Sequence, residues 1–119
     1  MCLPKEMKLT FKTMPLTTNS LYAHSGRVRF MTIKGKENKE AIAWEARSQY
    51  RGQPLGGSVG LKIDLCWPDR RNHDIDNIKV LIDALTGICW LDDGQITSLQ
   101  ITKRFEKGNA RVTLEAIQL

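Results

Sequence analysis

Cysteines are few in this sequence, and long apolar runs are missing from it. The three cysteines, Cys2, Cys66 and Cys89, are an odd number without C-x-x-C spacing, which argues against a disulfide framework and a cysteine-based zinc site. No apolar stretch approaches the roughly 20 residues that a membrane-spanning helix needs, and no signal peptide stands at the start. We therefore expect a cytoplasmic protein with reduced thiols and no membrane partner.

Internal repeats and low-complexity tracts are also missing, which argues against solenoid and disordered proteins. The composition, 41% hydrophobic and 26% charged, is that of an ordinary globular protein, and 119 residues fit one core. We predict a single domain over residues 1–119. We expect its core to include Cys66, Cys89, Trp44, Trp67 and Trp90.

Positive charge is in moderate excess. The 18 Lys and Arg residues exceed the 13 Asp and Glu residues, so the formal net charge is +5 at pH 7. This excess favours an anionic partner such as nucleic acid, although many basic proteins are simply soluble. The positions of the acidic residues are therefore more informative than the net charge.

The first half of the chain predicts a strand and a helix. Apolar and polar residues alternate over 7–11, the pattern of a half-buried strand. Residues 13–35 contain Pro, Asn, Ser and Gly and are predicted to form a long functional loop. Residues 36–49 lack Pro and place apolar residues near helical spacing, so we predict a helix there.

The second half predicts three strands and a short helix. Alternation over 59–67 indicates a strand, which Pro68 ends. A narrow apolar stripe over 78–85 indicates a short helix. Two further strands follow at about 96–105 and 110–119. This order predicts an α+β fold in which helices pack on a mixed sheet of about four strands.

Two pairs of aspartates flank the predicted short helix. Asp74 and Asp76 are two residues apart, so an extended backbone would direct both carboxylates to one side, where a hard cation could bridge them. Alternatively, Asp76 caps the helix and Asp74 is solvated. Asp92 and Asp93 could likewise form an exposed turn. Only convergence of the two pairs would make a metal site.

Three strings in this region carry a family resemblance. They are D-I-D-N at 74–77, D-A-L-T at 83–86 and W-L-D-D-G-Q-I at 90–96. Together they resemble the signature of the RusA family of Holliday junction resolvases. Two weaker likenesses accompany them, a P-x-x-x-N-x-x-Y pattern at 15–22 and the W-P-D-R-R string at 67–71.

The resemblance implies a homodimer of mixed α and β structure that binds four-way DNA junctions. It also implies paired symmetric nicks that depend on Mg²⁺ or Mn²⁺, made during recombination and repair. Carried over by position, Asp74, Asp76 and Asp93 are the metal ligands, and Lys79 is the catalytic basic residue beside them. The chemistry is coherent, because a metal can activate water and neutralise charge on the phosphate, to which Lys79 adds a positive charge.

The spacing around Lys79 departs from the family pattern. Only Ile78 separates Asn77 from Lys79, where the family has two residues, and one residue turns a helix by about 100°. Lys79 reaches the family position only if the helix starts differently. The alternative is a surface ion pair with Asp83, four residues further on.

Basic and loop residues complete the expected DNA contacts. We predict that phosphates around the acidic residues are held by Arg70, Arg71, Lys79, Lys103 and Arg104. We predict that the loop residues Asn19, Tyr22, Arg27 and Arg29 probe the junction, Tyr22 by stacking on an unpaired base. The alternatives are a solvated charged face and a core tyrosine.

Two other functions fit the same residues. A non-catalytic nucleic-acid-binding module would use the carboxylates only as caps and turn residues, and would need no metal. A metal-dependent nuclease for flaps or single strands would share the chemistry and differ in its substrate. A metal requirement separates the first alternative from a resolvase, whereas only a comparison of substrates separates the second.

Overall fold

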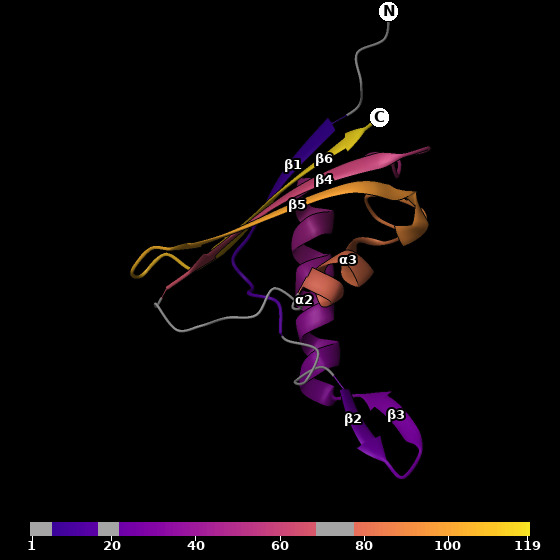
Figure 1. Ribbon diagram of the computed structural model, residues 1–119, viewed down its shortest axis with the longest axis vertical. Helices are drawn as coiled ribbons and strands as arrows, with labels where there is room; N and C mark the ends of the chain where they lie inside the picture. The colour runs from indigo at the N-terminus through magenta and orange to yellow at the C-terminus, as the bar shows by residue number, and fades with distance from the viewer. Residues whose placement is uncertain (1–5, 17–21, 69–77) are drawn as a thin grey trace, which may run out of the picture.

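A four-stranded mixed sheet is the frame of the molecule (Figure 1). The computed structural model describes residues 6–16, 22–68 and 78–119. The strand order is β1-β6-β4-β5, in which β6 is antiparallel to β1 and β4, and β5 is parallel to β4. The bounds are β1 (Glu6–Phe11), β4 (Val59–Trp67), β5 (Ile96–Phe105) and β6 (Arg111–Gln118). The predicted mixed sheet is therefore confirmed.

Alternation along β4 sets the two faces of the sheet. Leu61, Ile63 and Leu65 are buried on one face, whereas Lys62 is exposed on the other. Since β5 runs parallel to β4, the chain must cross over between them, and the helix α3 (Ile78–Leu85) lies in this connection. This crossover brings the segment before β5 close to the helical layer.

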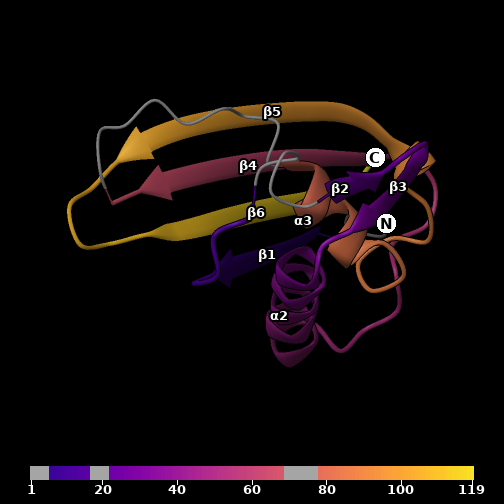
Figure 2. The same cartoon turned by 90° about the horizontal axis from the view of Figure 1, so that it is seen from below.

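Both helices cover the same face of the sheet, and the other face carries no helix (Figures 1 and 2). The longer helix, α2 (Ile33–Gln49), begins at Thr32, whose Oγ1 accepts a hydrogen bond from the Gly35 N–H at 2.9 Å. Ile42 and Ala46 are fully buried on the inner side of α2. The predicted helix is confirmed, and it starts three residues earlier than expected.

The short helix α3 closes the core from the same side. Leu81 and Leu85 of the predicted apolar stripe are fully buried, Ile78 and Ile82 are only partly buried, and Val80 is buried although it lies outside the stripe. Gly87 follows with a φ of 93°, a conformation that favours glycine and ends the helix. In the described part of the chain, no helix is long and apolar enough to cross a membrane.

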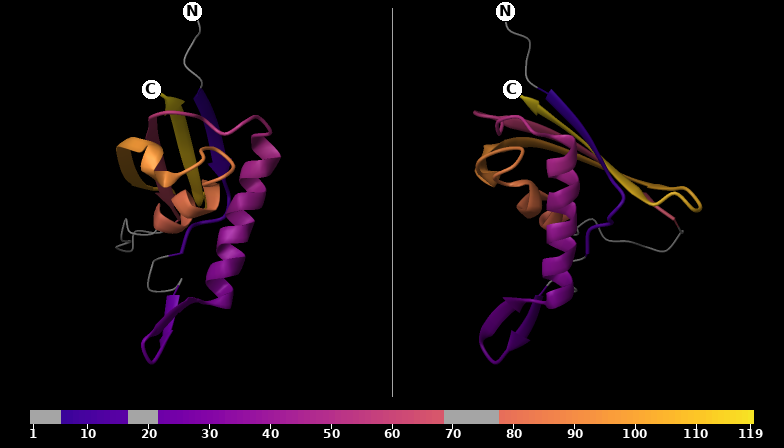
Figure 3. Two further views of the ribbon diagram at one scale, coloured as in Figure 1. Left: turned by 90° about the vertical axis from the view of Figure 1, so that its right-hand side faces the viewer. Right: turned by 180° about the vertical axis from the view of Figure 1, so that it is seen from behind.

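The prediction of a continuous loop over 13–35 is wrong. The segment contains a hairpin of β2 (Tyr22–Ser25) and β3 (Val28–Met31), joined by Gly26 and Arg27. Gly26 has a φ of 63°, which suits the first position of a two-residue hairpin turn. Each strand has only four residues, too few for a clear alternating pattern. The hairpin projects beyond the N-terminal end of α2, away from the sheet (Figure 3).

The three tryptophans do not share one environment. Trp90 is fully buried and Trp67 is partly buried, but 68% of Trp44 is exposed, so the prediction for Trp44 is wrong. Trp44 lies two residues after the buried Ile42, and two residues turn a helix by about 200°, which places Trp44 on the outer side of α2.

The two described cysteines behave as core residues, as predicted. Cys66 and Cys89 are both free and fully buried. Burial raises the pKa of the Cys89 thiol to about 12, so this thiol stays neutral at physiological pH. Cys2 lies outside the described residues.

Candidate active site

An acidic turn of residues 91–95 joins the helical layer to β5. It contains the short 3-10 helix η2 (Asp93–Gln95), and both Asp92 and Asp93 are exposed on it. The turn follows α3 by only a few residues, so the structure places Asp93 and the α3 residue Lys79 in one connection between β4 and β5.

Trp90 anchors the start of this turn to α3. Its indole Nε1 donates to Thr86 Oγ1 at 3.1 Å, and the Thr86 hydroxyl donates to the Ile82 carbonyl at 2.9 Å. The Trp90 carbonyl accepts from the Gly87 N–H at 2.6 Å. Because the indole is fully buried, the backbone entering the acidic turn is fixed against the core.

Gln95 holds the other end of the turn through four hydrogen bonds. Its Oε1 accepts from the N–H groups of Leu91 at 2.8 Å and Asp92 at 2.9 Å. Its Nε2 donates to the carbonyls of Leu55 and Gly57, each at 2.9 Å. All four hydrogen-bonding positions of the carboxamide are therefore used. The sequence pattern includes Gln95 but does not reveal this role, because its partners Leu55 and Gly57 lie about forty residues away.

The Asp93 side chain is available to a ligand. No hydrogen bond or ion pair reaches its carboxylate within the described part of the chain, although its backbone is fixed by the turn. An exposed carboxylate on a backbone that is held in place is a suitable ligand for a hard divalent cation. Residues 6–16, 22–68 and 78–119 contain no group of three metal-ligating side chains, and Asp74 and Asp76 lie outside them.

Lys79 lies in the first turn of α3, one helical turn before Asp83. Its Nζ is 3.5 Å from the Asp83 carboxylate, and the two side chains are 51% and 28% exposed. This is the ion pair that the sequence allowed as an alternative. An exposed pair of this kind is worth at most about 1 kcal/mol, so it does not prevent Lys79 from contacting a phosphate.

The other predicted DNA contacts fall into separate groups. Outside the described residues lie Arg70, Arg71 and Asn19. Tyr22, Arg27 and Arg29 belong to the projecting hairpin, and Arg27 is exposed at its turn. The structure therefore concentrates three of the predicted junction-probing residues on one element.

Lys103 and Arg104 are consecutive on β5 and so direct their side chains to opposite faces of the sheet. Arg104 lies on the uncovered face, where Nε and Nη2 contact the Asp64 carboxylate at 3.0 and 2.6 Å. The hydrogen bond to Asp64 raises the pKa of the Arg104 guanidinium above its usual value. A phosphate would have to compete with Asp64 for Arg104, whereas Lys103 lies on the helical side.

The fold and the acidic turn together define a small α+β protein that presents an exposed carboxylate on a hydrogen-bonded turn, an arrangement compatible with metal-assisted phosphate chemistry. Residues 12–116 match the family described as endodeoxyribonuclease RusA. The chain therefore belongs to the RusA family of endodeoxyribonucleases, which confirms the predicted resemblance.

Named relatives agree with this assignment. The chain is 30% identical over 91 residues to the crossover junction endodeoxyribonucleases RusA of Escherichia coli K12 and Enterobacteria phage 82, covering 75% of this chain and 76% of each relative. It is 29% identical over 115 residues to the RusA protein of Aquifex aeolicus, covering 93% of this chain and 90% of the relative. The similarity thus extends over most of each protein.

Proposed function

We propose that this protein is a divalent-metal-dependent endonuclease that cuts four-way DNA junctions in recombination and repair. The observation that carries the proposal is the exposed Asp93 carboxylate, which lies on a turn whose backbone Gln95 holds and accepts no hydrogen bond from the described chain, within a RusA-family sequence. The relatives are named crossover junction endodeoxyribonucleases, which supports a branched DNA substrate.

In this proposal Asp74, Asp76 and Asp93 hold Mg²⁺ or Mn²⁺. When bound, the metal supplies a Lewis acid and a nucleophilic water for hydrolysis of the phosphodiester. Asp93 contributes a carboxylate whose position the acidic turn maintains. Lys79 places a positive charge near the scissile phosphate, where charge develops in the transition state. Arg70, Arg71 and Lys103 hold the flanking phosphates.

The proposal also includes a homodimer acting in the cytoplasm, where its DNA substrate lies. A four-way junction has two-fold symmetry, and each subunit of a two-fold dimer would present one cleavage site to one of two opposing strands. Paired nicks then follow from geometry, because both sites have the same position relative to the symmetry axis.

The proposal is tested with three labelled DNAs of matched sequence, a four-way junction, a flap and a linear duplex, each with and without Mg²⁺. We expect symmetric nicks in the junction only when the metal is present, and much slower cleavage of the flap and the duplex. Metal-independent binding without cleavage would indicate a non-catalytic binding module instead. Equal cleavage of the flap would show that the enzyme is not specific for junctions.

A further inference from the structure

A groove of about 550 Å³ lies between α2 and α3 on the helical side of the molecule. The α2 side is lined by Lys36, Lys39 and Arg47, and the α3 side includes Asp83 and Thr86. We call this feature the α2–α3 groove. No role for these three cations is predicted from the sequence, because only the packing of α2 against α3 forms the groove that they line.

The cations follow one side of α2. Lys36 and Arg47 are eleven residues apart, which is three helical turns or about 16 Å along the axis, and Lys39 lies between them. A DNA duplex rises about 3.4 Å per base pair along its axis, so this row has the length of about five base-pair steps. Its dimensions suit an extended, regularly charged polymer.

The described part of the chain does not neutralise these cations. No carboxylate pairs with Lys36, Lys39 or Arg47 within the described residues. Of the two acidic residues that line the groove, Asp83 already pairs with Lys79, which leaves Glu40. The groove therefore retains a net positive charge.

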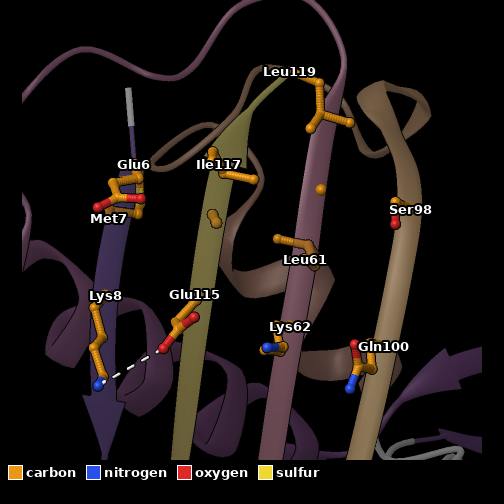
Figure 4. A pocket seen from close by; sticks show the side chains of 12 residues that line it. Glu6, Met7, Lys8, Leu61, Lys62, Ser98, Gln100, Glu115, Ile117 and Leu119 are labelled. Atoms are coloured by element: carbon orange, nitrogen blue, oxygen red, sulfur yellow. Dashed lines mark ion pairs between the residues drawn. The ribbon is translucent and has the colours of Figure 1, made fainter. Parts of the chain in front are cut away.

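The uncovered face of the sheet has a different balance of positive and negative charge. Lys8 pairs with Glu115 at 3.7 Å, as the dashed line in Figure 4 shows. Arg104 pairs with Asp64 at 2.6 Å, and Arg111 pairs with Glu106 at 3.0 Å. Most cations on that face are therefore compensated, and an anionic polymer would gain less by binding there than in the α2–α3 groove.

The groove also adjoins Lys79 through one of its lining residues. Asp83 lines the groove and pairs with Lys79, which the proposed function places at the scissile phosphate. A DNA strand that passes Lys79 can thus continue along α2 without leaving the positively charged surface.

We propose that the α2–α3 groove binds the phosphate backbone of a duplex arm of the DNA substrate, outside the point of cleavage. The inference rests on the proposed function, because it takes branched DNA as the ligand. Lys36, Lys39 and Arg47 contact phosphates there and read no base sequence. They contribute affinity that falls as salt concentration rises, since each contact releases counterions.

The test compares two variants with the same change in net charge. The first combines Lys36→Gln, Lys39→Gln and Arg47→Gln, which keep a good helix-forming residue at each position. The control combines Lys8→Gln, Lys62→Gln and Lys107→Gln, which lie on the uncovered sheet face and in the β5–β6 turn. Dissociation constants for the four-way junction are measured without metal between 50 and 200 mM salt, and thermal melting checks that both variants fold.

For the groove variant we expect the slope of log affinity against log salt to fall in magnitude by about 2.7, since each lost phosphate contact removes about 0.9. Its affinity near 100 mM salt should fall at least tenfold. The control should lose less than one unit of slope. The single variant Arg47→Gln should reduce the magnitude of this slope by about one unit, so the inference can still be tested if the triple variant is unstable.

Equal slopes for the groove variant and the control would overturn the inference, because the effect would then come from net charge alone. A second measurement tests whether the groove binds acidic protein instead of DNA, by adding polyglutamate as a competitor of junction binding. If the groove variant is no longer inhibited by polyglutamate but keeps the wild-type slope on DNA, the inference is also overturned, since the groove would then bind acidic protein. Either result leaves the proposed function intact if the wild type still cuts junctions. A wild type that neither binds nor cuts junctions refutes the proposed function itself.

Discussion

At the scale of single residues, Lys79 shows how one side chain can serve two contacts. In its ion pair with Asp83, Lys79 is exposed and Asp83 is only partly buried, so solvent screens the pair and the free energy it contributes is small. A phosphate near the first turn of α3 would accept a hydrogen bond from Lys79 in which donor and acceptor are both charged, and this bond would replace the weak ion pair. The ion pair is therefore weak enough for a bound phosphate to replace it.

We predict that Lys79→Ala slows single-turnover junction cleavage at least about tenfold, equivalent to roughly 1.4 kcal/mol of transition-state stabilisation. Asp83→Asn is the matched control, because it removes the same ion pair and leaves the lysine. This control should keep the rate within about twofold. Wild-type cleavage by Lys79→Ala would remove Lys79 from the catalytic residues.

At the scale of elements, the acidic turn depends on a contact between two distant parts of the chain. Gln95 joins the turn to the segment after α2 by bonding the carbonyls of Leu55 and Gly57. Trp90 fixes the same turn to α3. The turn can therefore keep Asp93 in place although its own residues are mostly exposed.

Gln95→Leu should lower the free energy of unfolding by about 2 kcal/mol, because it leaves two carbonyls and two N–H groups without their partner. Gln95→Glu keeps the acceptor and loses both donors, so it should cost a similar amount. Gln100→Leu on the following strand β5 is the control, since the exposed Gln100 side chain makes no hydrogen bond to the described residues, and it should change stability by less than about 0.5 kcal/mol. Equal destabilisation by Gln95→Leu and Gln100→Leu in urea denaturation would contradict this account.

The elements also show what the sequence could predict. Strand β4 alternates over nine residues with a fully buried side, so its pattern is strong, and its predicted bounds are correct. The β2–β3 hairpin has strands of four residues and was missed, because local pairing needs no apolar face. Trp44 was misplaced because the inner side of α2 is built mainly from small residues such as Ala43 and Ala46, which leave the direction of the apolar stripe weakly marked.

Some residues of the candidate site could also be predicted from the sequence, and others could not. Asp93 and Lys79 are predicted from the family resemblance, because the strings that carry it lie close together in the sequence. The supports of the site could not be predicted, because Gln95 bonds to residues about forty positions away and the cations of α2 meet α3 only through packing. Long-range contacts of this kind leave no periodic signal in a single sequence.

At the scale of the whole molecule, the described chain has one helical side and one open sheet face, and its principal extents are 53 × 37 × 25 Å. A molecule of this size can contact one branch point, but two simultaneous nicks in opposing strands need two active sites. The proposed homodimer supplies them through its symmetry.

We predict that sedimentation at micromolar concentration gives about twice the 13.5 kDa of one chain. Mixing an inactive Asp93→Asn subunit with wild-type subunits should yield junctions nicked on one strand only, because each subunit cuts one strand. A strictly monomeric protein that still makes paired nicks would refute the dimer.

The most direct test of the central claim compares Asp93→Asn with Asp92→Asn. The two substitutions change charge equally at neighbouring exposed positions, but only Asp93 is proposed to ligate the metal. We expect Asp93→Asn to reduce single-turnover cleavage of a four-way junction at least about 100-fold, roughly 2.7 kcal/mol, with junction binding kept and Mn²⁺ binding weakened. Asp92→Asn should remain within a few-fold of the wild type in all three measurements. Wild-type cleavage by Asp93→Asn, or equal loss in both variants, would contradict the account.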